Sequence, residues 1–203
     1  MHITIISGSH RNPSQSEKIA RYTNTVLEGH ADAEPFLFSL ADNPFPLWDQ
    51  SIWEGNEAWV ERLAPLKEQL IKSDALVIVT PEWHGQVPAG LKNLFLLFSR
   101  FELGHKPALI VAVSSATGGS YPVAELRMSS YKNNRLCYIP EHLIIRDVEK
   151  VLNDDPKDND EEADQYYKAR LSWCLDILMG YGKALSTMRN NTEIHHKDFA
   201  NGM

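Results

Sequence analysis

The segment Ala75–Asn93 constrains the fold most, because it combines a strand, a loop and a helix. Its apolar, β-branched start, Ala75–Val79, has the composition of a buried parallel strand. Pro81 ends this strand because it cannot donate a ladder hydrogen bond, and Pro88 presets φ for a following helix. Ligands of open α/β sheets bind outside the carboxyl ends of the strands. The loop between the prolines is therefore expected to line a binding site, where the flat ring of Trp83 suits a planar ligand.

The N-terminal segment has the same pattern with a polar loop. The apolar run Ile3–Ser7 predicts a strand, and a helix with one apolar stripe is expected after Ser16. Between them, Ser9 and Ser14 add hydroxyl groups, and Arg11 adds a guanidinium suited to phosphate. Backbone N–H groups and the helix dipole favour an anion at this point. The loop lacks the glycine patterns of dinucleotide-binding folds and P-loops, so a terminal monophosphate fits it better than a pyrophosphate.

A second interpretation of this loop needs no ligand. Ser14 and Glu17 have the spacing of a capping box, in which the Ser14 side chain accepts from the N–H of Glu17. Both roles use the same N–H groups. The Glu17 carboxylate would also repel a phosphate unless it points away.

Strand and helix patterns alternate along the rest of the chain, which predicts βαβ units around a parallel sheet. Five strands with intervening helices fit the order 2-1-3-4-5, whose switch point lies beside strands one and three. Further strands are expected in residues 34–40, 107–114 and within 136–146. Helices are expected over residues 57–73, 88–101, 120–132 and 160–188.

Two apolar segments leave their role open. The predicted helix 88–101 is apolar on more than one face, which favours a subunit interface over a helix sunk in its own core. The irregular segment 42–56 contains Trp48 and Trp53. Three roles fit these rings: a cover over the ligand, packing at an oligomer contact, or simple anchoring of the loop. Arg127 is expected to form a structural ion pair, with a nicotinamide-phosphate contact as the alternative.

The length of 203 residues suits a single domain over residues 1–190, with a polar tail, 191–203, that is expected to be disordered. No apolar run approaches the roughly 20 residues of a membrane span. Cys137 and Cys174 have neither metal nor redox spacing, and no signal-peptide pattern is visible, which predicts a cytoplasmic protein. Residues 147–164 hold nine acidic residues and two lysines, which accounts for the net charge of −7 and predicts a solvated loop. No basic stripe suggests nucleic acid as a partner.

Several motifs together resemble one family. These are Gly8-Ser9-x-Arg11-x-x-Ser14, Pro81-Glu82-Trp83-x-Gly85, the run Val87–Asn93 (V-P-x-x-L-K-N) and Gly118-Gly119. In this order and spacing they resemble the NAD(P)H-dependent FMN reductase family, which includes quinone, azo-dye and metal-oxyanion reductases. The resemblance covers roughly residues 1–150 and continues into the last helix. It implies a flavodoxin-like α/β fold, a three-layer sandwich around a five-stranded parallel sheet ordered 2-1-3-4-5.

The resemblance also implies a site for FMN. The first loop would hold the phosphate with Ser9, Arg11, Ser14 and Ser16. The second would lie along the isoalloxazine ring with Pro81, Glu82, Trp83, His84 and Gly85. The third would close the other side with Ser115, Gly118 and Gly119. The chain has Trp83-His84 where the family usually has Tyr-Asn, and Ser16 where it usually has Asn; both differences bear on substrate choice and flavin potential.

The implied reaction transfers a hydride from NAD(P)H to FMN and then to a small-molecule electron acceptor such as a quinone, within a homodimer or homotetramer. The flavin carries the chemistry, so no catalytic side chain is required, although His84 has a ring able to donate to the flavin or acceptor. Two alternatives remain open: an FMN-binding electron carrier or interaction module without turnover, and a phospho-ligand-binding α/β protein that never binds flavin.

The phosphate assignment predicts the effect of one substitution. Arg11→Ala should weaken FMN binding strongly and leave the fold intact, because Arg11 is the one charged phosphate donor assigned in the first loop. Titration of the variant with FMN, followed by flavin fluorescence, measures this effect, and an affinity equal to that of the unaltered protein would refute the assignment.

Overall fold

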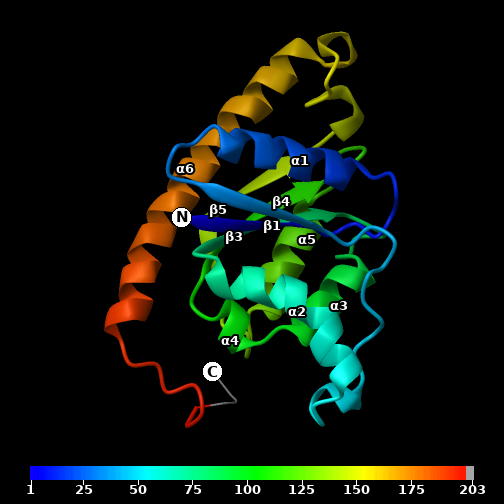
Figure 1. Cartoon of the computed structure of the whole chain (residues 1–203). Helices are drawn as coiled ribbons and strands as arrows, with labels where there is room; N and C mark the ends of the chain where they lie inside the picture. Colours follow the sequence, from blue (N-terminus) through cyan, green and yellow to red (C-terminus); the bar gives the residue numbers. More distant parts are fainter. Residues whose placement is uncertain (200–203) are drawn as a thin grey trace.

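Five parallel strands form the central layer of the computed structural model, which describes residues 1–199 (Figure 1). They are ordered β2-β1-β3-β4-β5, as predicted. β3 and β4 are buried throughout, which agrees with their continuous apolar sequences. The strands are β1 (His2–Ser7), β2 (Glu34–Ser39), β3 (Ala75–Pro81), β4 (Pro107–Val113) and β5 (Cys137–Ile145).

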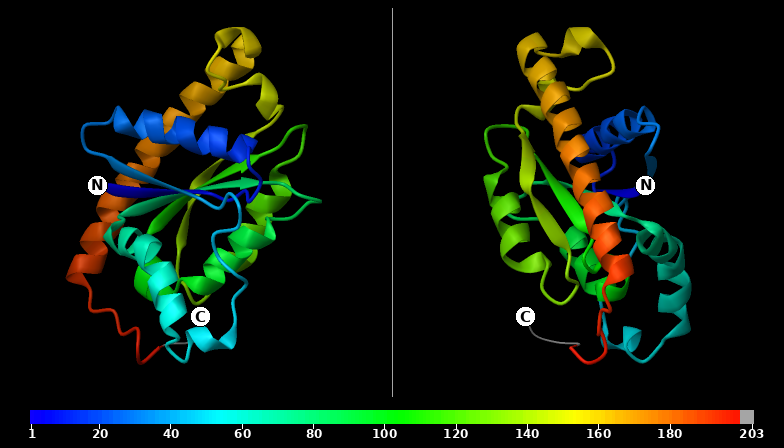
Figure 2. Two further views of the ribbon diagram at one scale, coloured as in Figure 1. Left: turned by 45° about the vertical axis from the view of Figure 1, so that its right-hand side comes forward. Right: turned by 90° about the vertical axis from the view of Figure 1, so that its left-hand side faces the viewer.

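Helices cover both faces of the sheet (Figure 2). The main helices are α1 (Gln15–Glu28), α2 (Glu57–Lys72), α3 (Ala89–Leu97), α4 (Arg100–Leu103), α5 (Ser120–Glu125) and α6 (Glu161–Asn191). Short helical turns are η1 (Gln50–Ile52), the π-helix η2 (Leu126–Ser130), η3 (Val148–Lys150) and η4 (Pro156–Asp158). α1 and α6 pack on one face, and α2, α3 and α5 pack on the other.

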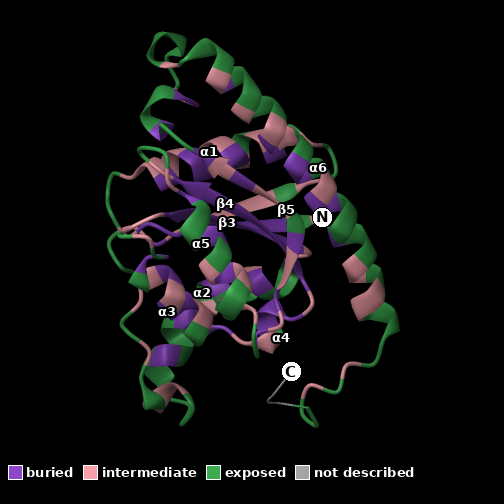
Figure 3. Cartoon of the chain, turned by 180° about the vertical axis from the view of Figure 1, so that it is seen from behind, coloured by how far each residue is buried: buried purple, intermediate pink, exposed green. Residues whose placement is uncertain are grey.

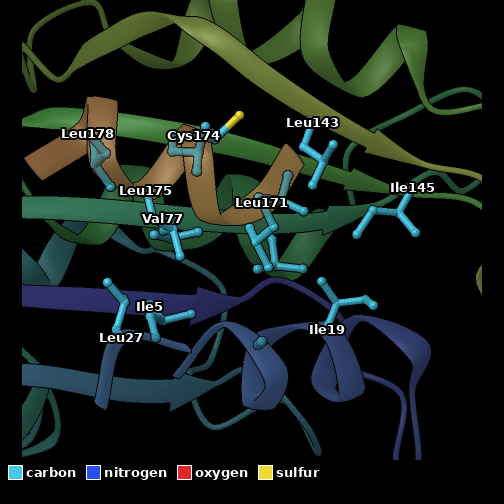
Figure 4. Close-up of a cluster of buried hydrophobic side chains, with 14 of the residues drawn as sticks. Ile5, Ile19, Leu27, Val77, Leu143, Ile145, Leu171, Cys174, Leu175 and Leu178 are labelled. Carbon is cyan, nitrogen blue, oxygen red and sulfur yellow. The ribbon is translucent and has the colours of Figure 1, made fainter. Parts of the chain in front are cut away.

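Each face has its own apolar core. On one side, Ile19 of α1 and Leu175 of α6 are fully buried against strand residues such as Val77 (Figure 4). On the other side, Leu66 of α2 and Leu91 of α3 form the second cluster. Burial is therefore concentrated along the sheet and the inner faces of the helices, while the outer faces remain exposed (Figure 3). Within residues 1–199, no helix is both long and apolar enough to cross a membrane.

The predicted helix 88–101 is wrong in one respect, because it is two helices. α3 ends before Phe98, which has an extended backbone, and Ser99 then begins α4 with a complete capping box to Glu102. The break buries Phe98. It leaves Leu96 and Phe101 at 65% and 55% exposure, so part of the apolar excess faces outward rather than the core.

The predicted helix 120–132 also changes form, since its second half is the π-helix η2. Arg127 of η2 donates from Nη2 to the carbonyl oxygens of Ile139 and Pro140, at 2.7 and 3.0 Å. The expected ion pair of Arg127 is therefore wrong, because its partners in the described structure are backbone carbonyls. Arg127 ties η2 to strand β5.

The segment 42–56 is anchored by one buried amide. Asn93 of α3 is 6% exposed; its Oδ1 accepts from the N–H of Trp48 at 2.7 Å, and its Nδ2 donates to the carbonyl of Pro46 at 2.8 Å. The rings of Trp48 and Trp53 contact each other with centroids 4.8 Å apart. Trp48 packs against the apolar cluster of α2 and α3. The anchoring interpretation of this loop therefore agrees with the structure.

The predicted tail, 191–203, falls partly within the described residues. Arg100 donates to the carbonyl of His196, and Arg135 contacts His196 and donates to the carbonyl of Phe199. These contacts place residues near 196–199 beside α4 and the start of β5. Residues 200–203 lie outside the described residues.

The anchoring role of Asn93 predicts a stability effect. Asn93→Ala should lower the free energy of unfolding by about 1–2 kcal/mol, because it removes two hydrogen bonds of a buried side chain and leaves the N–H of Trp48 and the carbonyl of Pro46 without this partner. Chemical denaturation followed by circular dichroism measures the change. Asn24→Ala on the outer side of α1 is the control and should cost less than about 0.5 kcal/mol; equal losses in both variants would contradict the anchoring role.

Candidate functional site

Three loops meet at the carboxyl edge of the sheet around a cleft of about 480 Å³. They follow β1, β3 and β4, whose ends lie side by side because Ser7 pairs with Val79 and Pro81 pairs with Val113. The cleft therefore lies at the switch point of the strand order, where open α/β sheets bind their ligands.

The first loop begins with a residue that has no room for a side chain. A Cβ on Gly8 would lie 2.6 Å from a methyl carbon of Leu91 and 2.8 Å from the carbonyl oxygen of Val79. The N–H of Gly8 donates to that same carbonyl at 2.7 Å. Glycine at this position lets the backbone after β1 pass close to β3 and α3. The residues that follow Gly8 then reach the cleft.

The start of α1 presents hydrogen-bond donors to the cleft. Ser14 is the N-cap residue, and its Oγ accepts from the N–H of Glu17 at 3.1 Å. The N–H groups of Gln15 and Ser16, both at the cleft, have no acceptor within the helix because they belong to its first turn. The Oε1 of Gln15 is buried with no hydrogen-bond partner among the described residues. The free N–H groups are suited to an anion, whereas the Gln15 Oε1 is an acceptor and would take a hydrogen-bond donor.

Glu17 does not oppose that anion. Its carboxylate pairs with Arg21 at 2.7 Å and accepts a hydrogen bond from the hydroxyl of Ser39 on β2. The capping box is therefore only half formed, since Ser14 caps the helix while Glu17 bonds elsewhere. Arg11 lines the cleft, and no ion pair of the described residues involves it.

The second loop is a tight hairpin turn. Trp83 and Gln86 exchange backbone hydrogen bonds of 3.0 and 2.9 Å, which leaves His84 and Gly85 as the two turn residues. Their φ angles of +51° and +72° are those of a type I′ turn, which favours Asn-Gly. His84 therefore occupies a position whose backbone favours Asn. Trp83 faces the cleft, and its ring meets the ring of His10 edge-on, with centroids 4.5 Å apart.

Glu82 joins the second loop to the third. Its backbone N–H donates to the carbonyl of Val113 at 3.1 Å, and its carboxylate accepts from the N–H of Gly119. A Cβ on Gly118 would lie 3.0 Å from the Glu82 carboxylate. Gly119 has φ of +102°, and a Cβ there would lie 2.4 Å from a methyl of Ile144. Gly119 is therefore required by its positive φ and by Ile144, whereas a side chain at Gly118 would require the Glu82 carboxylate to shift.

Most of the predicted site residues meet in this cleft. The first loop contributes Ser9, Arg11, Ser14 and Ser16, the second contributes Pro81, Glu82 and Trp83, and the third contributes Ser115. The structure does not place His84, Gly85, Gly118 or Gly119 among the lining residues. Sequence reasoning missed Pro13, Gln15, Lys18, Val113, Val148 and Glu149. Of these, Gln15 was detectable from its position at the start of the helix, whereas Lys18 and Glu149 are brought together only by the fold.

A second hollow of about 540 Å³ lies at the opposite, amino edge of the sheet. Exposed residues such as Asp32, Glu34 and Lys183 bound it, beside the C-terminal half of α6. It is larger but has no helix N-terminus and no strand-end loop. The strand-end cleft is therefore the better candidate for the functional site.

Comparison with known proteins identifies the family. The family model described as NADPH-dependent FMN reductase matches residues 1–150. The chain belongs to this family. It is accordingly an NAD(P)H- and FMN-dependent oxidoreductase of flavodoxin-like fold, as the motifs predicted.

Named relatives and solved structures agree with this membership. An NADPH azoreductase from Bacillus sp. (strain OY1-2) is 26% identical over 145 residues, which cover 71% of this chain and 76% of that protein. A quinone reductase from Escherichia coli (strain K12) is 36% identical over 124 residues, which cover 59% of this chain and 63% of that protein.

Two solved flavoenzymes share the fold. The NAD(P)H:(acceptor) oxidoreductase FerB from Paracoccus denitrificans has a TM-score of 0.70 at 20% identity, covering 90% of this chain and 97% of that one. An NADH:FMN oxidoreductase, EMOB, in its apo form has a TM-score of 0.68 at 15% identity, covering 97% and 96%.

The turn geometry predicts how position 84 tolerates substitution. His84→Asn should leave the free energy of unfolding within about 0.5 kcal/mol, because Asn adopts positive φ readily. His84→Val should lower it by about 1–2 kcal/mol, because a β-branched residue is strained in this conformation. Denaturation of the flavin-free proteins measures both. Equal stability of the Asn and Val variants would show that the turn is not type I′.

Proposed function

We propose that the strand-end cleft binds FMN, with the phosphate at the first loop and the isoalloxazine ring along the second. Two buried hydroxyl residues, Ser9 and Ser16, line the phosphate end together with Arg11. The first-turn N–H groups of α1 add uncharged donors, which suits a terminal monophosphate. The single observation that carries the proposal is this anion-binding helix start in one cleft with the ring of Trp83.

The cleft residues have distinct roles under this proposal. Trp83 provides the flat surface for the ring, and the His10 ring, edge-on to it, limits its rotation. Glu82 holds the third loop through Gly119, so that the second and third loops keep a fixed spacing around the ring. Bound FMN supplies the redox chemistry, accepting a hydride from a nicotinamide and passing reducing equivalents to an acceptor. His84, Gly85, Gly118 and Gly119 do not line the cleft, and under this proposal they shape the second and third loops that hold the ring.

We further propose a quinone-like or azo compound as the acceptor. The names of the azoreductase and quinone reductase relatives support this class. A flat, uncharged acceptor would need only ring stacking and an open cleft mouth. Reduction of such an acceptor requires no side chain as proton donor. His84, which is exposed in the turn after Trp83, is a nearby group that is able to donate a hydrogen bond.

The exposed apolar surface supports a homodimer or homotetramer. Trp53, Leu96 and Phe101 are 78%, 65% and 55% exposed, and they border a groove of about 350 Å³ between α2 and α3. Contiguous apolar surface of this kind favours burial against a second copy. Sedimentation equilibrium tests the assembly, and a mass equal to the chain mass of 23.0 kDa would contradict it.

We also propose a cytoplasmic location and a functional domain over residues 1–190. The free thiols of Cys137 and Cys174 support a reducing compartment. No described residue of the tail lines the cleft. Fractionation of cells that express the protein, followed by immunodetection, tests the location, and recovery outside the cytoplasm would contradict it.

One spectroscopic and kinetic experiment tests the function. The purified protein should be yellow or should bind added FMN with quenched fluorescence, and anaerobic NADPH should bleach the flavin absorption. Steady-state NADPH oxidation with a quinone should then show turnover on the order of 1 s⁻¹ or faster, as enzymes do. Trp83→Ala should weaken FMN binding, and Trp83→Phe, which keeps a ring, is the matched control. Flavin binding without turnover would instead favour an electron carrier, and absence of flavin binding would refute the proposal.

A further inference from the structure

The acidic segment that begins at Asp147 is held to helix α1 by one lysine. Lys18 of α1 donates from Nζ to the carbonyl oxygens of Val148 and Val151, at 2.7 and 2.8 Å. It also donates to Oδ1 of Asn153 at 2.7 Å. The prediction of a solvated loop therefore describes most carboxylates of residues 147–164. It does not describe the backbone of this segment, nor Asp164, which is 6% exposed and accepts from the N–H of Leu152.

The same segment is fixed on two further sides. The N–H groups of Asp147 and Val148 donate to the carbonyls of Ala116 and Ser114, which belong to the third loop, at 3.1 and 3.2 Å. Val148 is buried against the core shared by α1 and α6. Lys18 therefore links α1 to the acidic segment, which in turn is bonded to the third loop.

The linked residues form one wall of the cleft. Lys18, Val148 and Glu149 all line it, on the side of the first turns of α1. Because Val148 lines the cleft and its carbonyl accepts from Lys18, the position of that wall depends on the lysine. The Glu149 side chain is exposed, so a shift of the segment would also move a carboxylate near the anion-binding end.

The geometry requires Lys18 to be charged. Three donated hydrogen bonds use all three N–H groups of an ammonium. Burial lowers the pKa of Lys18, whereas the carboxylates of Glu149, Asp154 and Asp164 act to raise it. The acidic residues of the segment thus offset part of the cost of placing this charge beside the cleft.

We propose that Lys18 is a positioning residue for the phosphate end of the cleft, holding residues 148–153 against α1 so that the wall fits a phosphate monoester. The inference rests on the proposed binding of FMN. Without the lysine, three carbonyl or amide oxygens lose their donor, the wall loosens, and water and Glu149 gain access to the phosphate. The isoalloxazine ring, held at Trp83, is not affected.

The phosphate dependence separates this role from a general structural one. The test compares dissociation constants for FMN and for riboflavin, which has the same ring without the phosphate. Lys18→Met should weaken FMN binding about tenfold and leave riboflavin binding within about twofold. Lys18→Arg, which keeps the charge and several donors, should recover most of the FMN affinity. Lys157→Met is the matched control, because it removes an exposed lysine from the same acidic segment.

A second measurement uses the flavin-free protein. Amide hydrogen exchange should become faster in residues 148–153 of Lys18→Met, while exchange in β3 and β4 should remain slow because the core is unchanged. This measurement also detects a variant that fails to fold. Unchanged exchange in residues 148–153 would overturn the anchoring role.

The outcomes distinguish failure of the Lys18 role from failure of the proposed FMN binding on which it rests. Equal weakening of FMN and riboflavin, or unchanged FMN binding, in Lys18→Met would overturn the positioning role while leaving the flavin site intact. If the unaltered protein binds neither flavin, the proposed function fails and the phosphate role fails with it. Faster exchange in residues 148–153 would then show only that Lys18 anchors the segment.

Discussion

The alignment of three buried parallel strands is the constraint on which the rest of the structure depends. β1, β3 and β4 pair in register, so their carboxyl ends lie at one edge and their loops must emerge side by side. Because helices cover both faces of the sheet, the strands are mainly apolar, and polar side chains gather in the loops that follow them. The first polar residues after each strand therefore collect around one cleft, which explains how loops far apart in the sequence form a single site.

Under the proposed function, the cleft would bind an anion with little formal charge of its own. Its donors are mainly hydroxyl and backbone N–H groups, with Arg11 at the surface and Lys18 occupied by the protein. The acidic segment contributes much of the net charge of −7 next to this site. Exposed charges are screened over about 8 Å at physiological ionic strength, so these carboxylates act locally. The net charge of −7 is therefore no argument against the proposed phosphate site, because the placement of the nearby charges matters more than their sum.

Much of the fold could be predicted from the sequence because strand composition and helix caps are local properties. The apolar run at β3 and the serines before α1 each predict their own structure, and the order of the elements then predicts the sheet. The roles of Glu82 and Lys18 could not be found in this way. Glu82 binds Gly119, 37 residues away, and Lys18 binds Val148, 130 residues away. The break after α3 could not be predicted, because the apolar run continues through Phe101 and masks the short capping box between Ser99 and Glu102.

The motif Val87–Asn93 shows how a family signature can be structural. The N–H of Val87 and the amine of Lys92 both bind the Glu125 carboxylate, at 2.7 and 2.5 Å. Asn93 holds the segment 42–56, as described above. None of these three residues lines the strand-end cleft, so the motif identifies the scaffold and not the ligand contacts. In the second loop, Trp83 lines the cleft whereas His84, at a turn position with positive φ, does not. Of these two residues, Trp83 is therefore the one whose ring is presented to a ligand.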